Sequence, residues 1–235
     1  MSLNAIKKIV LLLVILCFGL LKSNAQGNLP YADDKLFHFG FSLGTGSFDY
    51  GVTVNTDSVS SAAVSSLVPS LSVGMIGDMR LARYLNLRFT PTLYFGSRTI
   101  QYKTLDGKDF SNEVFSIPIN LPLSLKYSAE RRDNYRPYLL WGAGVGIELN
   151  NDNENPILVR PMNFYTEFGV GCDLYFSYFK LCPELKFAIG LNDVLVPYSE
   201  RKAKGTLPSD QSKNFYSSAL NGLTSKLISL TFNFE

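Results

Sequence analysis

The chain has 235 residues, of which 46% are hydrophobic and 18% charged, and its formal net charge is +2. This length suits a single all-β domain. The weak net charge argues against a nucleic-acid partner, because proteins that bind nucleic acid carry a clustered basic excess. One histidine and three cysteines without a CxxC pair argue against a transition-metal centre.

Residues 1–25 have the pattern of a secretory signal peptide. Two lysines precede an apolar run over 9–21, which is shorter than the ~20 residues that a membrane-spanning helix requires. Small residues end the segment at Ala25, so we expect cleavage there and an exported domain over 26–235. Loss of the three leader lysines would change the net charge from +2 to −1. A retained N-terminal anchor is the alternative.

After the leader, apolar and polar residues alternate with a period of two, which is typical of β-strands with one apolar face. The segment 86–101 is the clearest example, with Leu87, Phe89 and Phe95 on one face and Arg88 on the other. The expected strands, in chain order, cover 37–44, 70–77, 86–101, 115–126, 138–148, 164–175, 179–190 and 228–235.

Full charges stay off the central part of every apolar face, as in strands that separate lipid from a polar lumen. Hydrocarbon tolerates no unpaired backbone group, so the strands must close. We predict an all-β fold, an eight-stranded antiparallel up-and-down transmembrane β-barrel. Long loops are expected over 45–67, 103–112, 150–161 and 193–222, and short turns over 78–84, 128–136 and 176–178. This asymmetry predicts an outer-membrane barrel with extracellular loops and both mature termini in the periplasm.

The polar face carries charges that an eight-stranded barrel must enclose. Such a barrel has room for side chains and not for a wide channel, so these charges should pair. Glu167 and Lys186 should be directly or diagonally opposed, with Glu184 near both. A proton or ion relay is the functional alternative. The predicted luminal polar network consists of Arg88, Arg98, Lys126, Glu148, Glu167, Asp173, Glu184 and Lys186.

The glycines, cysteines and prolines of the strands lead to further expectations. Luminal glycines would accommodate larger side chains opposite them. Cys172 and Cys182 fall on opposite faces, which argues against a disulfide. Because proline removes a ladder hydrogen bond, we expect bulges or bends, and an unfixed register, at Pro91, Pro118, Pro122 and Pro183.

Aromatic residues gather near the expected strand ends, as in the girdles at membrane interfaces. Ordinary β-propensity is the alternative explanation. The expected girdle members are Tyr127, Tyr135, Tyr138, Tyr175, Phe176, Tyr178 and Phe179 at the short turns, and Phe115, Phe164 and Tyr165 at the long loops.

We find no catalytic motif and expect no enzyme, cofactor, metal site or small-molecule substrate. His38 lies on a polar face without a recognisable nucleophile or orienting acid. An acyl hydrolase or acyltransferase is the alternative. The Asn-rich run 150–155 lacks the pattern of a calcium loop and reads as a solvated loop.

Several sequence blocks together resemble the PorT family of outer-membrane barrels: 35–41, 85–95, 134–138, 163–187 and the amphipathic end 230–235. The final strand is also similar to the terminal signal read by the barrel-assembly machinery, although Glu235 follows its last aromatic residue. The resemblance implies an accessory or structural part in type IX protein secretion, with membrane lipids and other secretion components as partners.

The charged turn that contains Arg131 and Arg132 is then a candidate partner-binding turn on the periplasmic side. Two other functions remain open. One is a passive structural or small-solute barrel without a secretion partner. The other is a soluble exported barrel that binds a lipid-like ligand, which requires the apolar faces to point inward.

Overall fold

The protein is described by a computed structural model that covers residues 29, 32–54, 59–64, 69–104, 109–149, 158–207 and 220–235. The expected signal peptide over 1–25 and the Asn-rich run 150–155 lie outside these residues. In the part of the chain that the structure describes, no helix is long and apolar enough to cross a membrane.

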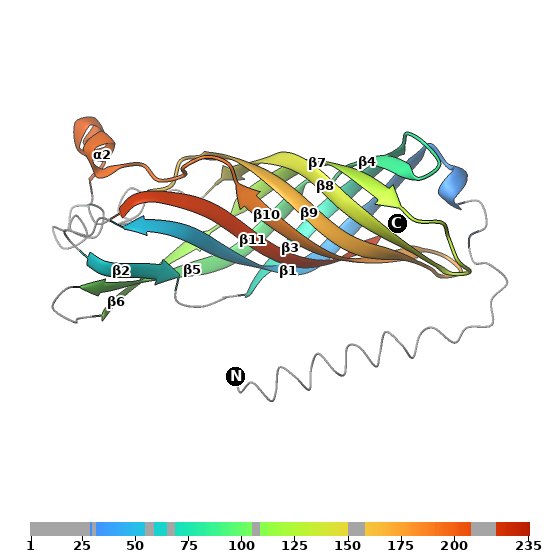
Figure 1. The fold of residues 1–235 in the computed structure, drawn as a ribbon, viewed down its shortest axis with the longest axis horizontal. Helices are drawn as coiled ribbons and strands as arrows, with labels where there is room; N and C mark the ends of the chain where they lie inside the picture. The colour runs from blue at the N-terminus through green and yellow to red at the C-terminus, as the bar shows by residue number, and fades with distance from the viewer. Residues whose placement is uncertain are drawn as a thin grey trace, which may run out of the picture.

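Strands make up most of the described chain (Figure 1). Two short helices accompany them, η1 near the N-terminus and α2 in the last long loop. The elements are η1 Ala32–Asp34, β1 Phe37–Val54, β2 Val59–Val64, β3 Pro69–Arg80, β4 Leu85–Phe89, β5 Thr92–Thr104, β6 Asp109–Ser116, β7 Pro118–Ser128, β8 Tyr135–Glu148, β9 Met162–Tyr175, β10 Lys180–Gly190, α2 Tyr198–Lys204 and β11 Leu220–Phe234.

The sheet closes on itself because β1 pairs with both β11 and β3, and every described pairing is antiparallel. Three of the strands are described in two parts each, as the pairs β2/β3, β4/β5 and β6/β7. Counted as whole strands, they form a closed eight-stranded antiparallel barrel, which confirms the predicted fold. Closure satisfies the backbone groups that an open sheet would leave at its edges.

The third predicted strand is divided at Pro91 into β4 and β5, but its register does not change there. The pairing against β3 that sets Phe89 opposite Gly77 also sets Phe95 opposite Leu71. The expected bulge is therefore wrong at this position. A proline loses only its N–H, and the neighbouring residues on both sides hold the alignment.

The other three prolines also leave the register intact. Pro118 begins β7 after an interruption at Ile117, and β6 and β7 continue one register against β5. Pro122 pairs regularly with Gly144, and the ladders of β10 with β9 and β11 keep one register on both sides of Pro183.

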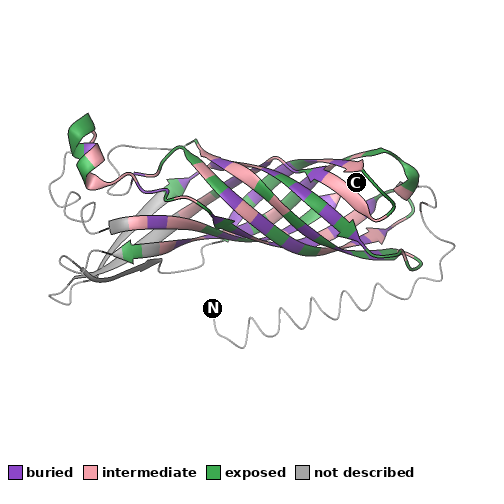
Figure 2. Cartoon of the chain, turned by 45° about the horizontal axis from the view of Figure 1, so that its top comes forward, coloured by how far each residue is buried: buried purple, intermediate pink, exposed green. Residues whose placement is uncertain are grey.

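Side chains alternate between the lumen and the outside along each strand, which Figure 2 shows as alternating bands of buried and exposed residues. Over the predicted strand segments the polar faces point inward and the apolar faces outward, which is the reverse of the arrangement that a soluble barrel with a lipid-like ligand requires. Both described cysteines are free; Cys182 is buried in the lumen and Cys172 is half-buried. Exposed outward-facing residues include Phe39, Phe41, Leu71, Met75, Leu123, Leu139, Trp141, Phe168, Val170 and Ile228.

The two ends of the barrel differ. At the short-turn end, tight connections join β3 to β4, β7 to β8, and β9 to β10, as predicted. At the long-loop end, the strands run further than predicted: β1 continues to Val54, and β5 and β6 reach Thr104 and Asp109. The expected loops over 45–67 and 103–112 are therefore partly strand.

The polarity of β1 reverses beyond Gly46, which explains why its extension was missed. Phe48 and Tyr50 are buried inside, whereas Ser47 and Asp49 face outward. Asp49 lies opposite Lys226 of β11 on this outer surface. A polar outside and an apolar inside are typical of a barrel wall in water, so this part of β1 and β11 extends beyond the lipid-facing zone.

Three tyrosines predicted for the aromatic girdles lie inside the barrel. Tyr138, Tyr165 and Tyr175 are buried in the lumen, as their polar-face parity requires. The other girdle candidates whose side chains are exposed on the outside are Phe115, Tyr127, Tyr135, Phe164, Tyr178 and Phe179.

Two of these tyrosines lie directly over glycines of a neighbouring strand. Tyr138 pairs with Gly171, and Tyr165 pairs with Gly144. A methyl group on Gly144 would come within 2.6 Å of the Tyr165 ring. The luminal glycines therefore make room for aromatic rings, as predicted.

Candidate functional site

Opposite charges fill the lumen toward the short-turn end. We call this group the ionic cluster. Its members project from β3, β4, β7, β9 and β10 and from the residue that follows β11, and each is buried or has a buried side chain. The ionic cluster comprises Asp78, Arg88, Lys126, Asp173, Lys180, Glu184, Lys186 and Glu235.

Arg88 is the centre of the ionic cluster. Its Nε donates to Asp78 Oδ2 at 2.9 Å, and its two terminal nitrogens donate to Glu184 Oε2 at 3.2 Å and to Glu235 Oε1 at 2.5 Å. The partner strands β4 and β10 are four places apart in either direction around the barrel. The pair of Arg88 with Glu184 therefore spans the full width of the lumen.

The remaining cations complete the ionic cluster. Lys126 Nζ lies 2.8 Å from Asp173 Oδ2 and 4.1 Å from the centre of the Tyr138 ring. Lys180 Nζ lies 2.5 Å from Glu235 Oε2. Tyr138 also donates its hydroxyl to Glu184 Oε2 at 2.8 Å. Ions removed from water are stable only when they are paired and hydrogen-bonded in this way.

Glu167 and Lys186 are diagonal neighbours, since Glu167 lies opposite Ala188 on β10. They form no ion pair with one another among the contacts described. Lys186 Nζ instead lies 3.3 Å from Glu184 Oε1, and Glu167 accepts a hydrogen bond from Ser124 Oγ at 2.6 Å.

The other two predicted network residues lie away from the ionic cluster. Glu148 is near the long-loop end, where it accepts hydrogen bonds from Ser116 Oγ at 2.6 Å and from the Ile117 amide at 2.9 Å. The Arg98 side chain lies outside the part of the chain whose side chains are described.

Three members of the ionic cluster were not predicted from the sequence: Asp78, Lys180 and Glu235. Asp78 lies just beyond the predicted end of its strand at 77, although it continues the inward parity. Lys180 and Glu235 were on polar faces but at strand ends, where exposure to water was the simpler expectation. The sequence did not indicate that these three side chains lie at the same level of the lumen as the other charges.

Apolar and aromatic side chains fill the lumen toward the long-loop end. We call this group the aromatic layer; it consists of Phe48, Tyr94, Tyr165, Ala188 and Leu227, all buried. The rings of Phe48 and Tyr94 meet edge to face, with centroids 5.4 Å apart and planes at 74°. Aromatic pairs favour this geometry.

Two chain segments meet at the long-loop end of the barrel, beyond the aromatic layer. Val159 and Leu195 form an isolated antiparallel bridge, and Asp193 Oδ1 accepts from the amides of Leu195 and Leu223 at 2.9 Å each. Val194 is 1% exposed. We call residues 158–160 and 193–197 the mouth segment.

Helix α2 follows the mouth segment and carries its own ion pairs. Lys204 Nζ donates to Glu200 Oε1 at 2.8 Å, and this hydrogen bond lowers the pKa of Glu200 from its ordinary value. Arg160 of the mouth segment donates to Glu200 Oε2 at 3.0 Å and connects the two elements.

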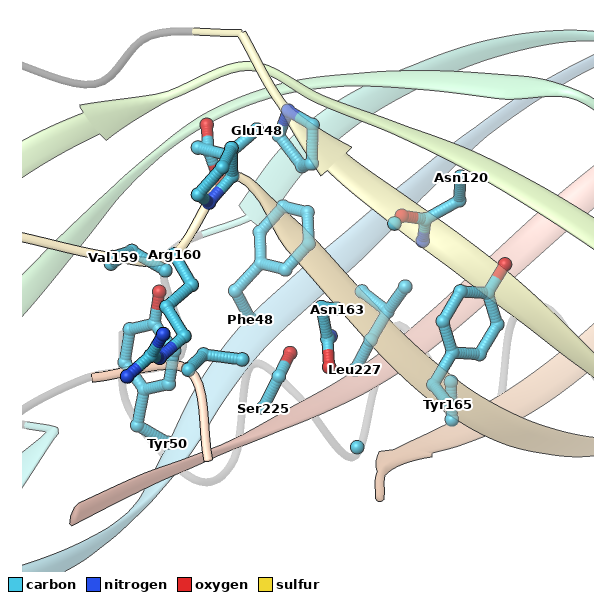
Figure 3. Close-up of a pocket in the computed structure, with 16 residues that line it drawn as sticks. Phe48, Tyr50, Asn120, Glu148, Val159, Arg160, Asn163, Tyr165, Ser225 and Leu227 are labelled. Carbon is cyan, nitrogen blue, oxygen red and sulfur yellow. The ribbon is translucent and has the colours of Figure 1, made fainter. Parts of the chain in front are cut away.

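A small cavity lies between the aromatic layer and the mouth segment (Figure 3). Its volume of about 40 Å³ is room for about three waters. The Tyr165 hydroxyl and Asn163 Oδ1 are buried at its wall and have no hydrogen-bond partner among the described residues. Polar atoms of this kind favour water in the cavity.

The short-turn end is covered by η1. Asp33 accepts a hydrogen bond from the Tyr175 hydroxyl at 2.7 Å and lies 3.5 Å from Arg136 and 3.9 Å from Arg131. Arg131, predicted to face a partner, is thus engaged with the protein's own N-terminal segment. Arg132, the second residue predicted for this role, is exposed.

No group of three or more histidine, cysteine, aspartate or glutamate side chains is arranged for a metal ion within the described residues. His38 projects from β1 near the short-turn end and is half-buried. A hydrolase would need a nucleophile and an acid arranged around it.

Strands with an apolar exterior, an ionic interior and short turns at one end define a β-barrel of the outer membrane. The chain belongs to the family described as "Outer membrane protein beta-barrel domain", whose model matches residues 24–196. Among solved structures it is similar to the outer membrane protein OprG from Pseudomonas aeruginosa. That match has 10% identity and a TM-score of 0.47, and it covers 84% of this chain and 92% of OprG. Among curated proteins none matches.

Proposed function

We propose that this protein is a non-enzymatic outer-membrane barrel that acts through its two ends and not through a pore. Its role would be that of an accessory or structural component of type IX protein secretion. The main observation against a pore is the ion pair of Arg88 with Glu184. The two charged groups lie 3.2 Å apart, although their strands are on opposite sides of the lumen. A solute that passed this level would have to separate buried ions from their partners.

The aromatic layer supports the same proposal from the other half of the lumen. A solute would meet it and the mouth segment before reaching the ionic cluster, and the described cavity between them is only about 40 Å³. With the lumen closed at two levels, the surfaces left for function are the long loops, the short turns and η1.

We infer the orientation of the barrel and the side on which partners bind from the behaviour of the outer-membrane class. Long loops are typically extracellular and short turns periplasmic in such barrels. The short-turn end and η1 would then face the periplasm, where secretion components meet the membrane. The type IX part of the proposal depends on the resemblance to PorT proteins in the sequence blocks described above.

The secretion role is tested in a deletion strain by comparing the proteins in the culture medium. Loss of exported cargo, restored by the wild-type gene, is the expected result. Arg132→Glu is the informative variant, because Arg132 is exposed while Arg131 holds η1. Lys202→Glu on α2 is the matched control at the opposite end. Normal secretion in the deletion strain would refute the type IX role.

A small-solute barrel is the second candidate, and the cavity at the long-loop end is the observation that favours it. Planar-bilayer recordings of the purified protein separate the two functions. A closed barrel gives no steady conductance at moderate voltage. A reproducible single-channel current would favour solute passage and would contradict the occluded lumen.

A further inference from the structure

The short-turn end contains a binding site for a carboxylate, built from Arg131, Arg136 and Tyr175. Its present ligand is Asp33, whose two oxygens lie 2.7 and 2.9 Å from the Tyr175 hydroxyl. Arg136 Nη1 is 3.5 Å from Oδ1 of Asp33, and Arg131 Nη1 is 3.9 Å from Oδ2. We call these three residues the carboxylate site.

The carboxylate site is held in place by contacts that do not involve Asp33. Arg136 Nε donates to the carbonyl of Ala129 at 2.8 Å, and its Nη2 donates to the carbonyl of Arg83 at 2.9 Å. Arg131 Cζ lies 3.7 Å from the centre of the Tyr175 ring, a cation–π contact. The site would therefore keep its shape if Asp33 left, as a pre-organised site should.

The segment that supplies Asp33 is held by few contacts. η1 has three residues, and the Asp34 side chain is 70% exposed and, among the described residues, contacts Arg80 at 3.3 Å. Upstream, the described contact is a hydrogen bond from Arg131 to the carbonyl of Leu29 at 3.1 Å. The exposed ion pair of Asp34 with Arg80 contributes about 0–1 kcal/mol. η1 is therefore held mainly by the contacts of Asp33 with the carboxylate site, and a competing carboxylate could replace them.

The charges around the site define what would replace η1. Arginines surround it on the turns that join β3 to β4 and β7 to β8 and at the adjoining strand ends, and Glu130 and Asp133 are the acids on those turns. Without Asp33 and Asp34, cations outnumber acids on this surface. These arginines are Arg80, Arg83, Arg131, Arg132 and Arg136.

We propose that the carboxylate site is a docking site for an acidic segment of a partner protein, with η1 occupying it in cis until the partner displaces it. The occupant's chemistry is taken from η1 itself, in which two consecutive aspartates follow a small residue. The proposal rests on the proposed function in one respect, that partners bind at this end of the barrel. A partner segment that enters the carboxylate site must carry negative charge.

Binding of a fluorescent peptide to the purified full-length barrel in detergent tests the proposal. The probe has the sequence of residues 30–36, and its control has both aspartates replaced by asparagine. A tethered ligand competes at an effective concentration of about 1 mM. Asp33→Asn removes that competitor, so a probe with an intrinsic Kd of about 0.1 mM should bind the variant about tenfold more tightly than the wild type.

Two further variants identify the site. Asp33→Asn combined with Tyr175→Phe, which removes the hydroxyl but keeps the ring, should lose the gain in affinity. Asp34→Asn is the matched control, because the described ion pair of Asp34 is with Arg80 and lies outside the carboxylate site, and it should bind the probe as the wild type does. Circular dichroism checks that each variant remains a folded barrel.

Equal affinity of the wild type and Asp33→Asn for the probe would overturn the proposal, as would equal binding of the asparagine control peptide. A loss of thermal stability in Asp33→Asn without a gain in binding would assign η1 a structural role only. These results are separate from the secretion test: a strain that exports normally would refute the type IX role and leave the peptide measurement unchanged.

Discussion

The two halves of the lumen are closed by opposite chemistries. Toward the short turns, eight charged side chains of the ionic cluster connect strands across the full width of the barrel. Toward the long loops, the aromatic layer lies beneath the mouth segment, with a small cavity between them. The outer wall changes in parallel, since β1 and β11 carry Asp49 and Lys226 on the outside above the lipid-facing zone.

The comparison shows that one barrel can use both ways of filling a lumen, each suited to its surroundings. In the lipid-facing zone the exterior must be apolar, so polar residues fall inside by strand parity and must neutralise each other. Above the lipid-facing zone the exterior faces water and can be polar. The alternation of side chains then places the apolar residues on the inside. The first half is held together by ion pairs, and the second by apolar packing and by backbone hydrogen bonds of the mouth segment.

Breaking the ionic cluster at its centre should have the largest effect. Arg88→Met removes the common partner of three carboxylates. Leaving buried ions unpaired should lower the free energy of unfolding by about 4 kcal/mol. Urea unfolding in lipid vesicles measures the loss. Arg132→Met, at an exposed position, is the control and should change stability by less than about 0.5 kcal/mol.

Opening the aromatic layer should affect stability somewhat less and conductance not at all. Phe48→Ala removes a buried ring from its contact with Tyr94 and should cost about 3 kcal/mol in the same unfolding experiment. Because the ionic cluster still closes the other half, bilayer recordings should show no steady current. A current in this variant would mean that the aromatic layer is the main barrier.

Removing a peripheral ion should have a smaller effect than removing the central one. In Lys186→Ala, Glu184 keeps Arg88 and Tyr138 as partners, so we expect a loss of about 1–2 kcal/mol and normal membrane insertion. Lys226→Ala, on the outer surface of β11, is the matched control. An unchanged melting curve for Lys186→Ala would contradict a cooperative ionic cluster.

Loosening the mouth segment should have the smallest and most local effect. Asp193→Ala removes the acceptor of two backbone amides, those of Leu195 and Leu223. Hydrogen exchange at these amides should become about tenfold faster, while the global unfolding free energy changes little. Ser199→Ala, exposed on α2, provides the control. Unchanged exchange would show that apolar burial alone holds the mouth segment.

The period-two pattern was sufficient to predict the number of strands, their faces and the class of barrel, because burial on one face is a local property of each strand. It failed where polarity reverses, as at Phe48 and Tyr50, since the pattern was interpreted with one rule for inside and outside. It also overestimated the effect of proline: a missing N–H disturbs one ladder bond, whereas register depends on the whole strand.

The site was harder to predict than the fold. Sequence placed Glu184 and Lys186 two residues apart on one face, which is a local relation. It could not identify the contact of Arg88 with Glu184, which depends on how far each strand is shifted against the next around the closed sheet. The carboxylate site was missed for the same reason, although its turn was singled out through Arg131.

Tyrosines that lie over glycines have a consequence for anyone who would engineer a pore through this barrel. Shortening Tyr138 or Tyr165 would leave bare backbone on two adjacent strands at the same height, next to Gly171 or Gly144. Glycine-rich strands are weak, so the rings that obstruct the passage also stiffen the wall. A wider bore would therefore require larger residues to replace those glycines at the same time as the tyrosines are removed.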